Sequence, residues 1–288
     1  MERCKTGLVL EGGAMRGMYT AGVLDVMMEN GIYTDGVIGV SAGAVFGCSY
    51  KSKQIGRTIR YNTKYCRDPR YMGIGTWLKT GDFFGADFCY RELPQKLDPF
   101  DQKAFKNNPM EFYVVCTDVH TGQPVYHQCK NGDDKDTQWM RASASMPLAS
   151  RIVSIDGYDL LDGGISDSIP IRQFRKMGYR KNIVILTRAR DYRKKRSKAF
   201  PILKAALRNY PELVKAMNRR HVVYNKTLDY LKKLEARGEA LIIQPEKAPH
   251  VKRTERDPKK LMELYAEGRQ DGLKNLEKLY VYCWQDND

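Results

Sequence analysis

The sequence Gly39-Val40-Ser41-Ala42-Gly43 constrains the fold of this chain more than any other stretch. It matches G-x-S-x-G, and it lies between an apolar segment at residues 36–40 and a helix-compatible segment that follows Ser41. This motif requires a sharp turn from a strand into a helix, in which the serine has a strained backbone and an exposed hydroxyl. A larger residue at Gly39 or Gly43 is therefore expected to clash, and Ser41 is a candidate nucleophile.

The segments around this motif alternate between strand and helix patterns. Strand patterns at residues 8–13 and 36–40 alternate with helix patterns at 17–29 and 42–52. Further strands are expected at residues 112–119, 124–129, 152–161 and 182–187. A β-α-β-α beginning is typical of a mostly parallel sheet, so we expect an α/β fold.

Glycines gather where the first expected strand ends, in the sequence EGGAMRG at residues 11–17. Peptide N–H groups of such a loop can converge on one point and form an oxyanion hole, where each donor contributes roughly 3 to 4 kcal/mol. Two nucleotide-binding motifs compete with this interpretation. A P-loop is excluded because Met18 follows Gly17, and a dinucleotide fingerprint is missed because Ala14 occupies the place of its middle glycine.

A catalytic serine also needs a base that accepts its proton. His221 and His250 follow in the order expected of a Ser/Asp/His triad, but both lie in basic, polar surroundings. His120 and His127 have the pattern of strand-end or core residues. Asp162, in the sequence LLDGG, follows an apolar segment and precedes two glycines, so it is the better candidate, with an ordinary Asp-Gly turn as the alternative.

Taken in order, EGGAMRG, GVSAG and LDGG resemble the patatin-like phospholipase family over roughly residues 5–190. The sequences RASASMPLAS and CTDVHTG look like further features of that family. The resemblance implies a three-layer α/β/α sandwich with a mostly parallel central sheet. It also implies a Ser/Asp dyad that works without histidine, metal or cofactor.

Carried over by position, the resemblance assigns a role to each motif residue. Ser41 becomes the nucleophile and Asp162 the general base, while the backbone amides of Gly12, Gly13 and Ala14 form the oxyanion hole. Ala14 departs from the family pattern, because many relatives have glycine there. The remaining motif positions are Arg16, Gly17, Gly39, Gly43, Gly163 and Gly164. For Arg16, both a contact with an anionic headgroup and a structural salt bridge are open.

The chain changes character near residue 190. Residues 188–288 hold 25 basic and 14 acidic side chains, and helical patterns follow at 200–218, 219–237 and 257–280. We therefore divide the chain into an acyl hydrolase domain at 5–190 and a basic, mainly helical C-terminal extension at 191–288. The layout resembles a bacterial subgroup of the family. The excess charge fits anionic lipid, nucleic acid or a solvated surface.

Two further segments bear on how a substrate is reached. Residues 66–94, rich in glycine and aromatic residues, are expected to form a long structured loop beside a substrate cleft. Leu203, Leu207, Leu213 and neighbouring apolar residues share one helical face. This face either packs into the core or rests on a membrane.

The remaining sequence signals concern location. The seven cysteines are scattered and without C-x-x-C spacing, which favours free thiols over disulfides or zinc. Neither a leader-like apolar stretch at the start nor an 18-residue apolar run occurs, so we expect a cytoplasmic protein without a transmembrane segment. Peripheral contact with an anionic membrane is left open.

These features together favour a lipid acyl hydrolase that forms an acyl-enzyme on Ser41, acts on phospholipid or lysophospholipid, and uses no cofactor. A general esterase or thioesterase would use the same residues. A non-catalytic lipid- or nucleic-acid-binding protein with the same fold is the alternative from another class, with nucleic acid the less favoured partner.

Overall fold

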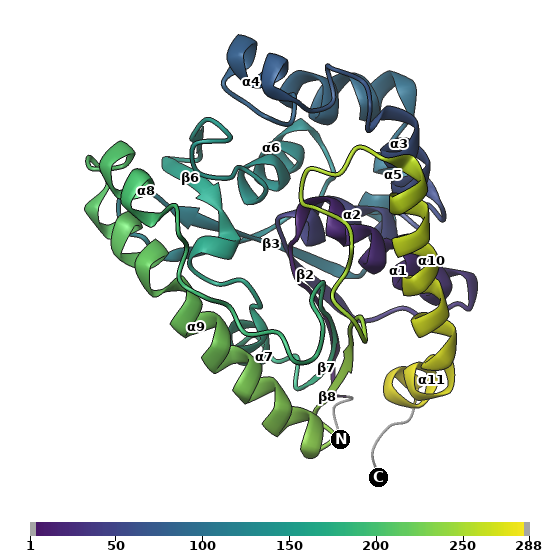
Figure 1. Ribbon diagram of the computed structural model, residues 1–288. Coiled ribbons are helices and arrows are strands. Elements are labelled where there is room, and N and C mark those ends of the chain that lie inside the picture. Colours follow the sequence, from purple (N-terminus) through teal and green to yellow (C-terminus); the bar gives the residue numbers. More distant parts are fainter. Residues whose placement is uncertain (1–3, 285–288) are drawn as a thin grey trace.

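Apolar side chains on both faces of strand β1 (Thr6–Leu10) explain why helices cover both sides of the sheet. Leu8 and Leu10 belong to one hydrophobic cluster and Val9 to another on the opposite face. The computed structural model, which describes residues 4–284, accordingly has three layers (Figure 1). The expected α/β/α arrangement with a mainly helical C-terminal region is confirmed.

The central sheet is mostly parallel. Its strands lie in the order β5-β6-β3-β2-β1-β7-β8, with β4 paired to β3. β2, β1, β7, β8 and β3 form the parallel part, whereas β4, β5 and β6 pair antiparallel. The strands after β1 are β2 (Gly36–Val40), β3 (Glu111–Asp118), β4 (Pro124–Gln128), β5 (Val153–Ile155), β6 (Tyr158–Asp162), β7 (Lys181–Ile185) and β8 (Ala240–Ile243).

Helices from distant parts of the chain share each face of the sheet. Buried residues of α1, α2 and α10 belong to the first cluster, and those of α7 and α9 to the second. The α-helices are α1 (Met18–Glu29), α2 (Ala42–Lys51), α3 (Arg57–Tyr65), α4 (Ile74–Thr80), α5 (Gln102–Asn107), α6 (Asp134–Ser143), α7 (Ile171–Lys176), α8 (Phe200–Ala206), α9 (Pro211–Ala236), α10 (Pro258–Lys274) and α11 (Leu276–Trp284). Short 3₁₀ turns occur at η1 (Ala14–Gly17) and η3 (Gly163–Ile165), and η2 (Phe88–Leu97) is a π-helix of ten residues.

Three expected elements differ in detail. Residues 152–161 form a hairpin of β5 and β6 because Asp156 and Gly157 both have positive φ and turn the chain. The expected helix at 200–218 is interrupted before Pro211, which begins α9. Residues 66–94 contain α4 and the start of η2 in addition to loops.

The C-terminal region is built into the same sheet and the same core. Residues 240–243 form the parallel edge strand β8, where the sequence pattern showed only an interruption between helices. Leu207 and Leu213 lie in a buried cluster with Leu161 of β6, so the apolar face at the start of this region packs into the core. The division near residue 190 stays a prediction.

Helix α10 crosses α1 at two glycines, one on each helix. A Cβ atom on Gly268 would lie 2.0 Å from the carbonyl oxygen of Tyr19, and one on Gly22 would lie 2.1 Å from that of Tyr265. The Tyr265 hydroxyl also donates to Asp25 over 2.7 Å inside the protein. The two backbones therefore approach as closely as glycine allows.

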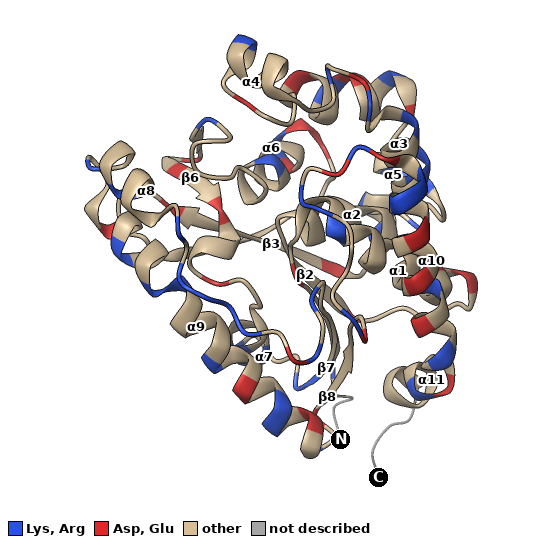
Figure 2. Ribbon diagram, in the orientation of Figure 1, with Lys and Arg blue, Asp and Glu red and all other residues tan. Residues whose placement is uncertain are grey.

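Cys4, Cys48, Cys66, Cys89, Cys116 and Cys129 are free thiols, as expected, and four of these six are buried. Within residues 4–284 no helix has the length and apolar character needed to cross a bilayer. Lys and Arg residues are frequent in the segment between β7 and α8, and along α9 they are interspersed with acidic residues (Figure 2).

Candidate active site

Ser41 lies on the sharp turn between β2 and α2. Its φ of 55° and ψ of −123° give it a positive-φ backbone conformation that residues other than glycine rarely adopt. A Cβ atom on Gly39 would lie 2.6 Å from the backbone of Gly43, and one on Gly43 would lie 2.4 Å from the carbonyl oxygen of Leu10. The crowding expected on both sides of the serine is therefore present.

Ser143, at the end of α6, fixes this turn. Its hydroxyl accepts a hydrogen bond from the Ser41 N–H (2.9 Å) and donates one to the carbonyl oxygen of Val115 in β3 (2.6 Å). The side chain is completely buried. One hydroxyl therefore ties the strained turn to the neighbouring strand.

Replacing Ser143 by alanine is expected to destabilise the protein by about 1 to 3 kcal/mol, because two buried backbone groups lose their partner. Chemical denaturation measures this loss. Ser145→Ala is the matched control, since Ser145 only donates to a carbonyl oxygen one helical turn earlier, that of Arg141. Equal losses in the two variants would contradict a special role for Ser143.

Asp162 ends β6 and lies beside the serine. Its carboxylate accepts a hydrogen bond from the Gly164 N–H (2.7 Å), and its own backbone N–H and C=O are bound by Ser145 and Thr117. Gly163 is required here because a Cβ atom would lie 2.0 Å from the carbonyl oxygen of Val115. The chain therefore holds the Asp162 side chain in one orientation.

Burial raises the pKa of Asp162 above its ordinary value. Arg220, the Gly164 N–H, a hydrogen bond from the Ser41 side chain and Arg253 all act in the opposite direction. An aspartate with a raised pKa beside a serine hydroxyl is suited to accept a proton.

The glycine-rich loop lies directly against the nucleophile. A Cβ atom on Gly12 would come within 2.7 Å of the Ser41 Cβ atom. Ala14 has a φ of 50°, so the position where relatives often have glycine is strained in this chain. Among the described residues, the N–H groups of Gly12, Gly13 and Ala14 have no acceptor, so all three are available to a ligand.

Glu11 anchors this loop. Its carboxylate accepts hydrogen bonds from the Thr187 N–H (2.8 Å) and from the hydroxyl of Tyr224 in α9 (2.6 Å). Thr187 in turn donates to the carbonyl oxygen of Gly12 over 2.9 Å. Gly17 closes the loop against the ring of Phe46, where a Cβ atom would lie at 2.6 Å.

Ser41 lies at the junction of two cavities. The first, here called the apolar cavity, is lined mainly by apolar and aromatic side chains, including Met15, Phe46, Tyr71, Phe84, Leu93 and Met140. The segment 66–94 contributes to it, as expected of a segment beside a cleft.

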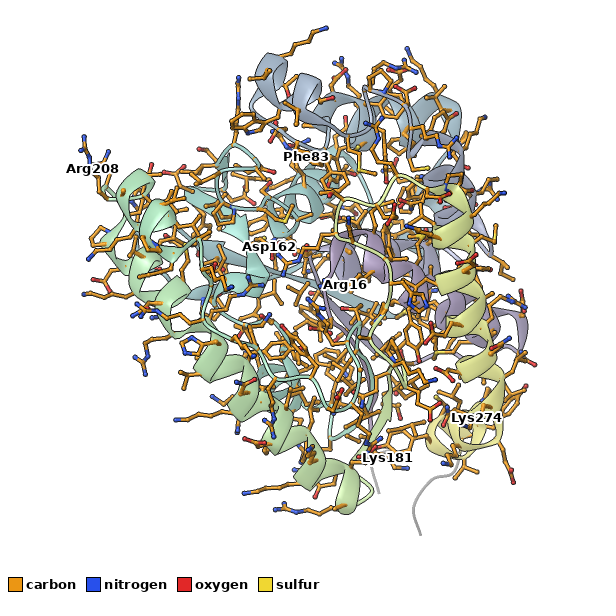
Figure 3. The ribbon with its side chains drawn as sticks, in the orientation of Figure 1. Arg16, Phe83, Asp162, Lys181, Arg208 and Lys274 are labelled. Atoms are coloured by element: carbon orange, nitrogen blue, oxygen red, sulfur yellow. The ribbon has the colours of Figure 1, made fainter. Side chains whose placement is uncertain are left out.

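The second cavity, here called the cationic cavity, contains Asp162 and the glycine-rich loop. It is also lined by five basic side chains: Arg16, Arg188, Lys194, Arg220 and Arg253. Arg16 and Asp162 both lie in the interior of the molecule (Figure 3). No salt bridge to Arg16 occurs within residues 4–284, and its Nε atom is buried without a partner.

Sequence reasoning missed the convergence of these cations. Lys194 belongs to a run of basic residues, a pattern that is typical of a solvent-exposed segment, yet this residue is half-buried. His221 and His250, the alternative bases, line neither cavity, and His120 pairs instead with Asp159 over 2.8 Å. No local pattern distinguishes Lys194 from the lysines around it.

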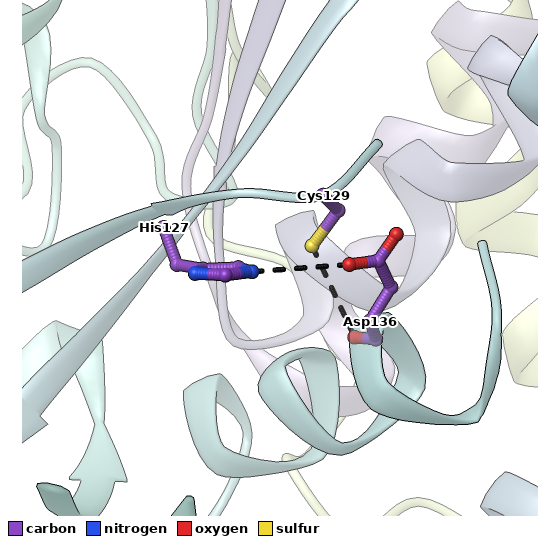
Figure 4. A group of neighbouring side chains, drawn as sticks. All are labelled: His127, Cys129 and Asp136. Atoms are coloured by element: carbon purple, nitrogen blue, oxygen red, sulfur yellow. Dashed lines mark hydrogen bonds and ion pairs between the residues drawn. The ribbon is translucent and has the colours of Figure 1, made fainter. Parts of the chain in front are cut away.

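A separate group of possible metal ligands lies away from Ser41. His127, Cys129 and Asp136 place one ligand atom each within 4.8 Å of one another (Figure 4). The Cys129 thiol donates to the backbone carbonyl of Asp136, and the second carboxylate oxygen of Asp136 accepts the N–H groups of Asn131 and Gly132. Burial raises the pKa of Cys129. These contacts are those of a buried structural aspartate, in agreement with the core interpretation of His127.

Two family models match different parts of this chain. A family model described as patatin-like phospholipase matches residues 8–175, and one described as domain of unknown function (DUF6363) matches residues 210–284. The uncharacterized protein YjjU of Escherichia coli is 28% identical over 189 residues, which are 64% of this chain and 52% of YjjU.

Lysophospholipase nte1 of Aspergillus oryzae is 28% identical over 179 residues, or 60% of this chain and 11% of that protein. The chain thus matches about half the length of one curated relative and a small part of the other. Among solved structures, VipD from Legionella pneumophila aligns with a TM-score of 0.46 and 12% identity, over 96% of this chain and 67% of VipD.

Proposed function

Because this chain belongs to the patatin-like phospholipase family, we propose that it is a serine-dependent lipid acyl hydrolase with Ser41 as nucleophile and Asp162 as base. The observation that carries this proposal is the position of Ser41. Its hydroxyl is on a strained turn, beside a buried aspartate with a raised pKa, where an apolar and a cationic cavity meet. An ester with an acyl chain on one side and a polar group on the other fits this junction.

The reaction proceeds in two steps. Ser41 Oγ attacks the ester carbonyl carbon while Asp162 accepts the hydroxyl proton, and that proton passes to the departing alcohol oxygen as the ester bond breaks. Water then attacks the acyl-serine and gives its proton to Asp162. Fatty acid leaves, Ser41 regains its proton, and Asp162 returns to the carboxylate.

The oxyanion formed in each step requires hydrogen-bond donors. We assign this role to the N–H groups of Gly12, Gly13 and Ala14, because they have no acceptor among residues 4–284 and Gly12 lies against Ser41. The strained backbone of Ala14 agrees with a loop shaped for binding, since strain of this kind collects at functional sites.

The test uses a fluorophosphonate probe and mixed phospholipid vesicles. We expect the probe to form one adduct, located by mass spectrometry on the peptide that contains Ser41, and we expect the vesicles to release fatty acid. A purified, folded protein that neither reacts with the probe nor releases fatty acid would refute the proposal and favour a binding protein. Release from short soluble esters alone would favour the general esterase.

Access from a lipid surface is part of this proposal. Ile74 and Leu78 on α4 expose 70% and 73% of their surfaces, and the indole of Trp77 between them donates to the Leu148 carbonyl. α4 directly follows residues that line the apolar cavity. We therefore place the contact with membrane at α4.

Replacing Leu78 by aspartate is expected to reduce hydrolysis of vesicle lipid at least about fivefold, because a charge at this surface opposes its entry into lipid. Hydrolysis of a short soluble ester should stay within twofold. Ile202→Asp on α8, where Ile202 is 68% exposed, is the matched control on the basic C-terminal region. A larger effect of Ile202→Asp would move the membrane contact to that region.

A further inference from the structure

The cationic cavity has more positive charge than the hydrolysis of an ester requires. Its five basic side chains face only two carboxylates, those of Glu11 and Asp162, among the described residues that line it. Glu11 is already bound by Thr187 and Tyr224. None of the five cations makes a salt bridge within residues 4–284. Of the five, Arg16 is buried, Arg188, Lys194 and Arg220 are half-buried and Arg253 is exposed. Positive charge gathered in a cavity in this way favours a negatively charged partner.

Hydrogen bonds of the backbone hold two of these cations in place, and an aromatic ring packs against the charged group of one of them. The backbone of Lys194 is bound on both sides by Asn225 of α9, at 2.9 and 3.0 Å, and its ammonium lies 4.2 Å from the centre of the Tyr224 ring. The carbonyl oxygen of Arg253 accepts the Met15 N–H (3.3 Å), which brings this exposed residue to the glycine-rich loop.

Arg220 comes from α9 and approaches the base. A Cβ atom on Gly164 would lie 3.1 Å from its Nη2 atom. Its Nε atom is buried and has no hydrogen-bond partner, as is also true of Arg16, which is only 7% exposed. The buried Arg16 and the half-buried Arg220 therefore each have an unused Nε–H donor beside the cavity that contains Asp162.

The cations also repel one another. Burial and the charges of Arg220, Arg253 and Arg188 lower the pKa of Lys194 to about 7, with Glu11 acting in the opposite direction. Burial and neighbouring arginines likewise lower the pKa of Arg16 to about 10. A bound anion would relieve this repulsion and keep Lys194 protonated.

We propose that the C-terminal region completes the active site by building a phosphate-binding subsite in the cationic cavity, and that the substrate is an acyl lipid whose headgroup is a phosphate monoester. Lys194, Arg220 and Arg253 lie in that region, and the last two fall within residues 210–284, which the family model described as a domain of unknown function matches. That the phosphate belongs to a substrate rests on the proposed hydrolysis at Ser41.

The charge balance favours a monoester over a diester. A phosphate monoester carries about −1.5 to −2 at neutral pH and has three terminal oxygens, whereas a diester carries −1. Five cations against two carboxylates leave more charge than a diester neutralises. Arginine side chains suit this ligand because each guanidinium can donate two parallel hydrogen bonds to phosphate oxygens.

The first experiment compares three substrates that share one acyl chain: acylglycerol 3-phosphate, acylglycerophosphocholine and monoacylglycerol, in the same mixed micelles. We expect kcat/KM to be highest for the monoester and lowest for monoacylglycerol. Arg220→Gln and Lys194→Gln should each lower the ratio between these two substrates at least about tenfold. The ratio is informative because an effect on Asp162 acts on all three substrates alike.

Arg219→Gln is the matched control. Arg219 precedes Arg220 on the same helix, is exposed, and lines neither cavity, so the change in net charge is identical. We expect it to leave the ratio within twofold. Unchanged ratios in Arg220→Gln and Lys194→Gln, or an equal change in Arg219→Gln, would overturn the inference.

A second experiment does not depend on turnover. Three proteins are compared by calorimetric titration: Ser41→Ala alone, Ser41→Ala with Arg220→Gln, and Ser41→Ala with Lys194→Gln. Each is titrated separately with glycerol 3-phosphate and with inorganic phosphate. Binding of glycerol 3-phosphate that either second substitution weakens at least tenfold supports the subsite, even if hydrolysis fails. Tighter binding of inorganic phosphate would instead assign the cavity to free phosphate and overturn the headgroup assignment, and binding of neither anion would overturn the subsite.

Discussion

Ser41→Ala is expected to lower kcat/KM for lipid esters by about 10⁴-fold or more, and Asp162→Asn by about 10³-fold or more, because each removes one member of a pair that works as a unit. Probe labelling should disappear in the first variant and become slower in the second. The double variant should be about as inactive as Ser41→Ala alone. Additive losses would contradict a shared proton transfer between the two residues.

The raised pKa of Asp162 adds a pH dependence with a definite sign. The aspartate must be ionised to accept a proton, so kcat/KM should fall as pH falls through a pKa above the ordinary aspartate range. Stability changes in the opposite sense. A folded-state pKa above the unfolded one means that the contribution of Asp162 to stability is complete at low pH and is lost as pH rises through the folded pKa.

Asp162→Asn should therefore be less active and yet more stable than wild type at neutral pH, since asparagine buries no charge and can still accept from Gly164. Thermal unfolding at pH 7 checks this. A large loss of stability in Asp162→Asn would mean that the carboxylate serves the fold and not the chemistry.

Gly268→Val is expected to cost at least about 3 kcal/mol of folding free energy, because its side chain would have to displace the backbone of α1. The nearest atom, the carbonyl oxygen of Tyr19, lies only 2.0 Å from the added Cβ position, and a backbone atom cannot rotate away. Gly22→Val on the partner helix should have a similar cost for the reciprocal reason.

Gly272→Ala on the same helix is the control. A Cβ atom there would meet only the Val26 side chain, at 3.1 Å, so a shift of a few tenths of an ångström relieves the contact. Denaturant titration of the variants compares them directly. Unfolding of Gly268→Val at the wild-type midpoint would show that α10 is not packed on α1 in solution as described.

The sequence predicted those elements that local patterns specify. A strand followed by Gly39-x-Ser41-x-Gly43 admits few geometries, so the turn at Ser41 and the helix after it could be placed in advance. Asp162 could be found because it follows an apolar segment and precedes two glycines, although an ordinary Asp-Gly turn has the same local pattern.

The parts that were missed depend on contacts between distant residues. A four-residue apolar run at 240–243 has no feature that distinguishes an edge strand beside β7 from a loop between helices. The contacts of four site residues come from elements more than twenty residues away in the sequence: Ser143, Lys194, Arg220 and Arg253. Neither the periodicity nor the charge pattern of the sequence predicts such contacts. Arg16 left two interpretations open, and the absence of a salt bridge to it among residues 4–284, with its Nε atom unbonded, favours the ligand over the salt bridge.

The packing of α10 on α1 also bears on how the protein is made. The bond between Tyr265 and Asp25 joins residues 240 positions apart, and every residue of α1 from Met18 to Met28 is buried in the finished fold. During synthesis α1 leaves the ribosome long before α10 exists, so one of its apolar sides stays uncovered in the nascent chain. Contacts of such high sequence separation form late. The protein is therefore expected to need a chaperone, or to aggregate, when translation stops before residue 258.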